Sequence, residues 1–180
     1  MPAILRSLQR LLKALEQYNV ACMVIGGYAL PFYGRIRTTV DLGLAVAIRT
    51  EEELKRLCGW LKENDFEVTI GSFLNPLIVV VDRKEGVEME LWMRPDGIVF
   101  DGAALRRRRK VRLGEGVEAW VVSPEDFIVN KLARPDRGAV DEQDVRSVLV
   151  RQKDKLDWEY LKKRAQESGV LTILQIIQAQ

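Results

Sequence analysis

The segment from Val24 to Val46 constrains the fold of this 180-residue chain more than any other feature. A short apolar run ends in Gly26-Gly27, a short helical stretch follows, and a second apolar run begins at Asp41. Glycines at the end of a strand let the backbone approach a phosphate closely, and the N-terminus of the following helix offers free N–H groups. A carboxylate on the adjacent strand can hold a magnesium ion against that phosphate. The segment therefore predicts a phosphate-binding α/β structure.

The remaining periodicity predicts a mixed sheet with helices around it. The first helix is expected over residues 3–18, with apolar side chains on one face at Ile4, Leu8, Leu11, Leu12 and Leu15. Further helices are expected at 51–64 and 124–133, with two or three more behind them. Strands are expected at 21–25, 41–48, 66–70, 76–82 and 87–93, with a hairpin formed by 107–113 and 117–122.

This order of elements predicts an α/β (α+β) fold with a mixed central sheet flanked by helices and a helical C-terminal part. We expect one domain over residues 1–180, with a core at about 20–122 and the helical part at about 123–180.

The composition is that of a globular protein, with 47% hydrophobic and 30% charged residues. The net charge of +2 does not by itself indicate a nucleic-acid partner. The chain has no histidine, so any catalysis rests on carboxylates, lysines, hydroxyls or a bound metal. Cys22 and Cys58 lie in apolar stretches and are expected to be structural thiols. No signal peptide or membrane span is visible, so a cytoplasmic protein is expected.

Several motifs occur in a fixed order over roughly residues 20–150. They are Gly26-Gly27, Arg37-x-Thr39-x-Asp41, the strand Glu88-Met89-Glu90, Lys131 behind Ser123-Pro124-Glu125-Asp126, and Asp141-x-x-Asp144. Together they resemble the nucleotidyltransferase superfamily, in particular its minimal members and the toxin-associated branch related to AbiEii proteins.

The resemblance implies Mg²⁺- or Mn²⁺-dependent transfer of a nucleotide from an NTP to a hydroxyl of RNA, a protein or a small molecule. In that family, acids spaced i and i+2 on one strand and a third acid from a neighbouring strand bind two metal ions. The implied catalytic residues are Asp41 and Glu90, and the implied metal ligands are Asp41, Glu88 and Glu90. The implied nucleotide-binding residues are Gly26, Gly27, Arg37, Thr39 and Lys131.

The motif departs from the family at one position, where Gly43 stands in place of the second aspartate. Losing a shared ligand is expected to weaken metal binding severely, because even outer-shell losses typically cost about 10- to 100-fold. Two functions therefore stand side by side. One is an enzyme in which Glu88 compensates, and the other is a catalytically degenerate binding or regulatory protein, possibly part of a toxin–antitoxin pair.

Other residues also have two interpretations. Glu88 either faces solvent or joins the site, and Lys131 is either solvated or directed at a triphosphate. Asp141 and Asp144 are explained by charge stabilisation at a helix N-terminus. The basic run from Arg106 to Lys110, with Arg112 beyond it, either contacts RNA phosphates or an acidic partner, or forms a charged edge strand that resists aggregation.

Overall fold

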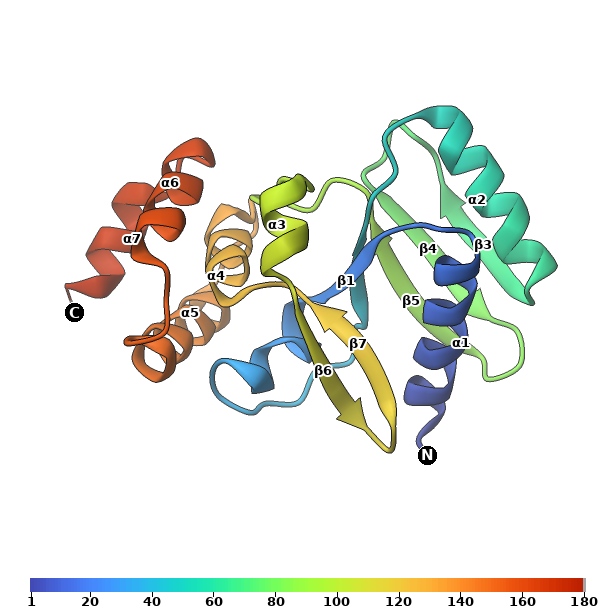
Figure 1. The fold of residues 1–180 in the computed structure, drawn as a ribbon, viewed down its shortest axis with the longest axis horizontal. Coiled ribbons are helices and arrows are strands. Elements are labelled where there is room, and N and C mark those ends of the chain that lie inside the picture. The colour runs from blue at the N-terminus through green and yellow to red at the C-terminus, as the bar shows by residue number, and fades with distance from the viewer. Residues whose placement is uncertain (180) are drawn as a thin grey trace. The chain divides into compact units, whose positions relative to one another are not determined.

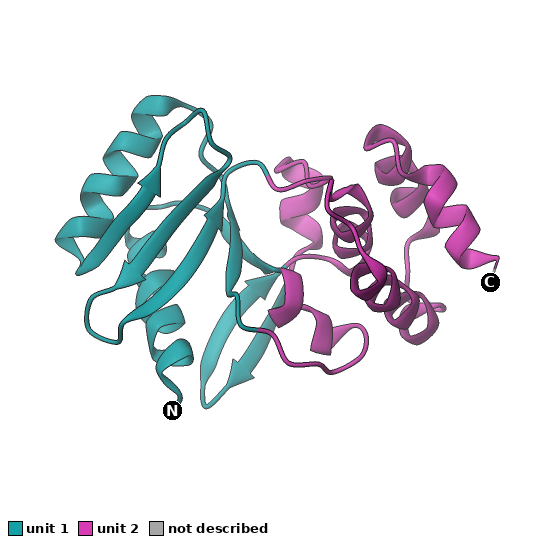
Figure 2. Ribbon diagram, turned by 180° about the vertical axis from the view of Figure 1, so that it is seen from behind, with its two compact units in different colours: residues 1–25, 40–94, 109–121 teal, residues 26–39, 95–108, 122–180 magenta. Residues whose placement is uncertain are grey.

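The computed structural model describes residues 1–179, which form two compact units (Figures 1 and 2). Unit 1 contains residues 1–25, 40–94 and 109–121, and unit 2 contains residues 26–39, 95–108 and the chain from Val122 onward. Each unit thus gathers segments that lie far apart in the sequence.

Unit 1 is built on a mixed sheet with the strand order β3-β4-β5-β2-β1-β7-β6 in the described residues. The strands are β1 (Cys22–Ile25), β2 (Gly43–Val46), β3 (Phe66–Gly71), β4 (Leu77–Asp82), β5 (Val87–Trp92), β6 (Arg109–Gly114) and β7 (Val117–Val121). Strand β2 runs parallel to β5 and β1 runs parallel to β7, whereas the other neighbours are antiparallel. The prediction of a mixed central sheet is confirmed.

Helices α1 (Ala3–Gln17) and α2 (Glu51–Glu63) lie beside each other on one face of this sheet (Figures 1 and 2). The apolar stripe of α1 packs inward, with Leu8, Leu11 and Leu15 fully buried. Helix α2 begins at the capping box that Thr50 forms with Glu53. The indole N–H of Trp60 on α2 donates a hydrogen bond to the carbonyl of Ala14 on α1 at 2.9 Å, which joins the two helices.

The other face of the sheet carries the polar side chains of β5. Met89 and Leu91 are buried, whereas Glu88 is exposed and Glu90 is half-buried, as expected from the alternation of side chains along a strand. We call this second surface the Glu90 face and define it by Gly43, Glu90, Trp92 and Trp120. Trp120 belongs to it because Val121, its neighbour on β7, pairs with Val24 on the opposite face.

Unit 2 is helical, as expected for the C-terminal part. It contains α3 (Gly102–Arg107), α4 (Pro124–Ala133), α5 (Ala139–Gln152), α6 (Trp158–Glu167), α7 (Leu171–Gln178) and two 3₁₀ turns, η1 (Gly26–Tyr28) and η2 (Leu30–Phe32). Helix α4 is central, since its side chains from Pro124 to Leu132 are all buried. It starts where predicted, because the hydroxyl of Ser123 accepts a hydrogen bond from the N–H of Asp126.

Three local predictions need correction. The strand expected over 41–48 spans only Gly43–Val46, so Asp41 lies before the strand, where no ladder holds its backbone. Arg107 is the last residue of helix α3, not part of the hairpin, because Asp101 caps a helix there by accepting from the N–H of Ala104. The short helix expected after Gly27 is a pair of 3₁₀ turns.

Within the described residues, Cys22 is buried, Cys58 is half-buried and neither forms a disulfide. Burial raises the pKa of the Cys58 thiol. In residues 1–179 no helix combines the length and the apolar character that a membrane crossing requires.

Candidate functional site

The predicted site residues are found in both units. Asp41, Glu88 and Glu90 belong to unit 1, and Gly26, Gly27, Arg37, Thr39 and Lys131 belong to unit 2. We therefore describe the carboxylates and the glycine segment separately.

The carboxylates lie where the parallel strands β2 and β5 meet. Gly43 is paired in register with Glu90, and the backbone N–H of Glu90 donates to the carbonyl of Leu42 at 3.0 Å. Asp41 lies two residues before Gly43 and is exposed. The residue directly beside Glu90 on the neighbouring strand is therefore the one that lacks a side chain.

The carboxylate of Glu90 already has a partner on its own strand. The indole N–H of Trp92 donates to Oε2 of Glu90 at 3.0 Å, as residues i and i+2 on one strand face can do. The position of Gly43 nevertheless has room for a side chain. A Cβ atom there would lie 3.4 Å from Cγ1 of Ile25 and 3.9 Å from Cδ1 of Trp92, which are ordinary van der Waals separations.

A metal site of the expected kind needs several oxygen ligands directed at one point. Within residues 1–179, no three His, Cys, Asp or Glu side chains come close enough together to hold a metal ion. Asp41, Glu88 and Glu90 as placed do not fit a two-metal centre, since Gly43 contributes no ligand and Glu90 is bonded to Trp92.

Gly26 and Gly27 are both required by the local geometry of unit 2. Gly26 has φ of +65°, a left-handed conformation that glycine adopts without strain. A Cβ atom on Gly27 would lie only 2.4 Å from Oγ1 of Thr39 and 2.6 Å from its Cβ. Two of the predicted nucleotide-binding residues, Gly27 and Thr39, therefore pack directly against each other.

We expect the substitution Gly27→Ala to destabilise the protein by about 1–3 kcal/mol, because the added methyl overlaps Thr39 and forces a backbone shift. Gly59→Ala is the matched control. It adds the same methyl within helix α2 where nothing lies within 4 Å, and it is expected to stabilise by about 0.5–1 kcal/mol. Urea unfolding of both variants measures the difference, and equal effects would contradict the steric argument.

Lys131 and Arg37 belong to a charge cluster around Asp144, whose side chain is 0% exposed. Asp144 accepts from Arg35 Nε at 2.8 Å and from Arg37 Nη2 at 3.0 Å, and Lys131 Nζ lies 3.3 Å away. Lys131 also donates to Asp141 at 2.7 Å. Burial opposes ionisation of Asp144, but the hydrogen bonds from Arg37 and Arg35 outweigh it and hold the pKa of Asp144 below its usual value.

These contacts correct two expectations. Lys131 is 3% exposed and ion-paired, so it is neither a solvated lysine nor a free cation aimed at a phosphate. Asp141 and Asp144 do more than favour a helix N-terminus, since they neutralise buried or half-buried cations. Four cations face these two carboxylates, because Arg134, which also pairs with Asp136, lies 3.7 Å from Asp141. Positive charge is therefore in excess at the partly exposed Arg35 and Arg37.

Arg35 and the role of Asp144 were not identified from the sequence. The Arg35-x-Arg37 spacing was visible, but its partner lies 107 positions beyond Arg37. No local pattern indicates a pairing over that distance.

A second buried polar network joins helices α4 and α6. The hydroxyl of Tyr160 donates to Asp126 at 3.0 Å and accepts from Arg164 Nε at 3.0 Å, and Arg164 also binds both oxygens of Asp101. Burial raises the pKa of Asp126 despite hydrogen bonds from Tyr160 and Ser123 that lower it. The network satisfies its members internally, as buried polar groups require, and we assign it a structural role.

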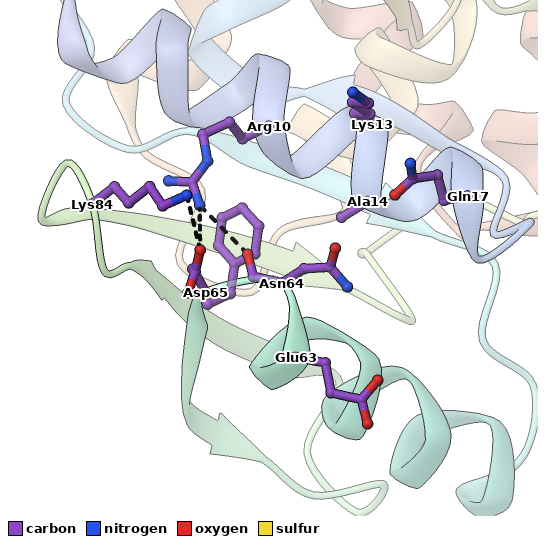
Figure 3. Close-up of a pocket in the computed structure, with 9 residues that line it drawn as sticks. Arg10, Lys13, Ala14, Gln17, Glu63, Asn64, Asp65 and Lys84 are labelled. Carbon is purple, nitrogen blue, oxygen red and sulfur yellow. Dashed lines mark hydrogen bonds and ion pairs between the residues drawn. The ribbon is translucent and has the colours of Figure 1, made fainter.

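Unit 1 also has a hollow of about 340 Å³ between α1, the end of α2 and the start of β3 (Figure 3). It is lined by Arg10, Lys13, Ala14, Gln17, Glu63, Asn64, Asp65, Phe66 and Lys84. Lys84 binds Asp65 at 2.9 Å, and Arg10 approaches Asp65 to 3.7 Å. Arg10 also bonds Asp82, which is 0% exposed, so its main role is to neutralise a buried carboxylate.

Replacing Arg10 by methionine is expected to destabilise unit 1 by about 3–5 kcal/mol, because it leaves the charge of Asp82 buried without its ion-pair partner. Lys13→Met on the same helix is the control, and its exposed side chain should change stability by no more than about 0.5 kcal/mol. Chemical denaturation compares them. Adding Asp82→Asn to Arg10→Met should recover part of the loss, and no recovery would show that the buried charge is not the cause.

Comparison with known proteins identifies the chain. Residues 4–169 match the family model described as "Nucleotidyl transferase of unknown function (DUF2204)". The chain belongs to this nucleotidyl transferase family. No match was found among curated protein sequences.

Solved structures confirm the nucleotidyltransferase fold. An antigenic nucleotidyltransferase-like protein from Paracoccidioides brasiliensis is 18% identical, with a TM-score of 0.54, over 98% of this chain and 93% of its own. The antibiotic-resistance factor ANT(2'')-Ia is 14% identical, with a TM-score of 0.55, over 97% and 96%. The lincosamide antibiotic adenylyltransferase LnuA, bound to lincomycin, is 12% identical, with a TM-score of 0.51, over 79% and 94%. At these identities the likeness concerns the fold alone, and the AbiEii branch stays a prediction.

Proposed function

We propose that this member of the nucleotidyl transferase family binds a nucleoside triphosphate but is catalytically degenerate. The observation that carries the proposal is the register of β2 and β5, which places Gly43 directly beside Glu90. In the fold's expected chemistry, that position supplies a carboxylate. Its absence removes one acid of the expected set, and Glu90 is bonded to Trp92.

The size of the defect follows from ligand chemistry. Carboxylate oxygens are the ligands that Mg²⁺ prefers, and each missing charge in a shared site weakens binding. Because loss of an outer-shell partner typically costs about 10- to 100-fold in affinity or activity, loss of a direct ligand should cost more. The expected outcome is transfer at or near background.

Nucleotide binding has support of its own in unit 2. Gly26 and Gly27 bring the backbone to a turn without side chains, and Thr39 packs on Gly27. Arg37 keeps a quarter of its side chain exposed while Asp144 orients it. We assign the phosphate contact to Gly26, Gly27, Arg37 and Thr39, and we assign Lys131 to support of Arg37 through Asp144 and not to the triphosphate.

A degenerate scaffold acts through a partner. A regulatory or binding role in a toxin–antitoxin pair is the form of this proposal that the sequence resemblance favours. Binding to that partner, and not formation of a reaction product, would then be the activity to measure.

The second candidate is an active Mg²⁺- or Mn²⁺-dependent nucleotidyltransferase that uses Asp41 and Glu90. One observation favours it, namely that Glu88 lies on the same strand face as Glu90 and is exposed. Two structural neighbours are named for antibiotic modification, which makes a small-molecule hydroxyl one acceptor class to test beside RNA and protein.

The test measures binding and transfer separately. Titration with a fluorescent ATP analogue should show saturable binding that weakens in Arg37→Ala. Incubation with α-labelled NTPs, Mg²⁺ or Mn²⁺ and RNA, protein, lincosamide or aminoglycoside acceptors should show no transfer. Label transfer by the unmodified protein that disappears in Asp41→Ala would overturn the degenerate function and establish the second candidate. Absence of NTP binding would contradict both.

A further inference from the structure

Trp92 lies on the Glu90 face beside the position where Gly43 lacks a side chain. It is paired in register with Ala45 on β2 and with Leu77 on β4. On β2 both residues of this face, Gly43 and Ala45, are small, so the indole has room to lie over that strand. Its Cδ1 atom is 3.9 Å from the position that a Cβ atom of Gly43 would occupy. The ring therefore reaches back along the sheet toward Gly43.

The indole N–H is directed at the carboxylate of Glu90. Nε1 of Trp92 donates to Oε2 of Glu90 at 3.0 Å, and both side chains are half-buried. In the part of the chain that the structure describes, no lysine or arginine forms an ion pair with Glu90. Burying a charged group is costly unless a polar partner compensates it, and here a neutral donor is that partner.

One edge of the indole bridges position 43 and Glu90. Cδ1, which is 3.9 Å from a Cβ at position 43, is bonded directly to Nε1, which is 3.0 Å from the Glu90 oxygen. A cation shared by acids at positions 43 and 90 would lie between these two paired residues. The positive edge of an aromatic ring lies there instead.

We propose that Trp92 closes the metal position of this sheet face, so that restoring a carboxylate at position 43 recovers only part of the metal affinity. The inference rests on the proposed function, because it gives a second cause for the degenerate site. Glu90 has to release the indole N–H before its Oε2 can bind a cation. Trp92 thus opposes metal binding independently of the missing acid at Gly43.

An alternative role for the same bond is support of a metal ligand, because ligating carboxylates are commonly hydrogen-bonded to a neighbouring group. The place of the indole argues against that role. A supporting donor lies behind the carboxylate, away from the ion, whereas this ring edge lies on the side of Gly43. The two roles predict opposite effects of removing the N–H, and the experiment separates them by the direction of the change.

The test measures Mn²⁺ binding by Gly43→Asp, with and without Trp92→Phe. Electron paramagnetic resonance counts free Mn²⁺, so that no NTP, acceptor or turnover is needed. Trp92→Phe keeps an aromatic ring but removes the donor. We expect it to raise the Mn²⁺ affinity roughly 10- to 150-fold, the equivalent of one hydrogen bond to a charged group. An unchanged affinity, or the fall of about 10- to 100-fold expected on loss of a supporting partner, would overturn the proposal.

Trp60→Phe in the same Gly43→Asp background is the matched control. It also removes an indole hydrogen bond, the one of 2.9 Å to the carbonyl of Ala14, but Trp60 belongs to α2 on the opposite face of the sheet. Its Mn²⁺ affinity should equal that of Gly43→Asp alone. A rise as large as that of Trp92→Phe would overturn the proposal, because it would come from general loosening of the unit.

A second measurement needs no change at Gly43 and no metal. In a proton–nitrogen correlation spectrum of the unmodified protein, Trp92→Phe identifies the indole signal of Trp92 as the one that disappears. Glu90→Gln should move that signal, because a neutral amide is a weaker acceptor than a carboxylate, and should leave the Trp60 signal in place. An unmoved Trp92 signal in a folded Glu90→Gln variant would overturn the proposal. Label transfer by the unmodified protein would contradict the proposed function and leave this signal unaffected, so the two failures are distinguishable.

Discussion

Replacing Gly43 by aspartate is expected to create Mg²⁺- or Mn²⁺-dependent nucleotide transfer at least about 10- to 100-fold above that of the unmodified protein. The added carboxylate would stand beside Glu90 and two residues after Asp41, which restores the family's Asp-x-Asp spacing directly before and at the start of β2. The backbone needs no rearrangement, because the nearest atoms to a Cβ at this position, in Ile25 and Trp92, lie at 3.4 and 3.9 Å.

The same variant has a readout that does not depend on activity. Without metal, a second carboxylate beside Glu90 adds like-charge repulsion and should lower the melting temperature. With Mn²⁺ the melting temperature should rise with metal concentration, because the ion binds the folded state alone.

Two controls separate the effect of the added carboxylate charge from the effect of the added side-chain volume. Gly43→Ala supplies the Cβ without charge and should neither bind metal nor transfer nucleotide. Gly43→Asp combined with Asp41→Ala should lose the gain. A folded Gly43→Asp variant that binds NTP yet shows no metal-dependent stabilisation and no transfer would contradict the proposal that position 43 limits this site.

Removing the carboxylate of Asp144 by substitution to alanine is expected to destabilise unit 2 by about 3–5 kcal/mol. Asp144 is fully buried and neutralises Arg35, Arg37 and part of Lys131. Without it, Lys131 keeps the carboxylate of Asp141, whereas Arg35 and Arg37 lose the carboxylate that they share and keep only neutral acceptors such as Gln143 and Thr38. The segment from Arg35 to Thr39 then keeps only the hydrogen bonds of Arg35 to Ser147, Gln143 and Val140 on helix α5. Its attachment is weaker on the Arg37 side, and NTP binding should weaken with it.

The control is Asp136→Ala, which removes an exposed carboxylate paired with Arg134 and should cost no more than about 1 kcal/mol. Urea unfolding followed by circular dichroism compares the two. A loss below about 1 kcal/mol in Asp144→Ala would show that the cluster is not a stabilising unit.

The pH dependence of stability tests the same cluster. The pKa of Asp144 is lowered in the folded state, so its contribution is present above the pKa of an unfolded aspartate, about 3.9. That contribution is lost as the pH falls through the lower folded value. The unmodified protein should therefore lose stability below about pH 4, and Asp144→Ala should show a shallower decline over that window.

The sequence by itself determined the elements whose signals are local. The apolar spacing of α1, the Thr50 and Ser123 caps and the alternation along β5 each depend on residues within a few positions, so they survive in any tertiary context. The ordered motifs also indicated the nucleotidyltransferase fold. The missing carboxylate at Gly43 could be recognised from the sequence because the family motif that contains this position spans only neighbouring residues.

Only the tertiary structure decided what the charged side chains contact. Lys131 is buried because Asp141 and Asp144 neutralise it, and Arg37 reaches Asp144 across 107 positions. Helix α3 was missed because its six residues, Gly102–Arg107, are too few to show an apolar period. Trp120 and Glu90 share a face through the register of intervening strands. Long-range pairing leaves no periodic trace in a single chain, since charge and hydrogen bonding are satisfied by proximity in space and not by spacing in sequence.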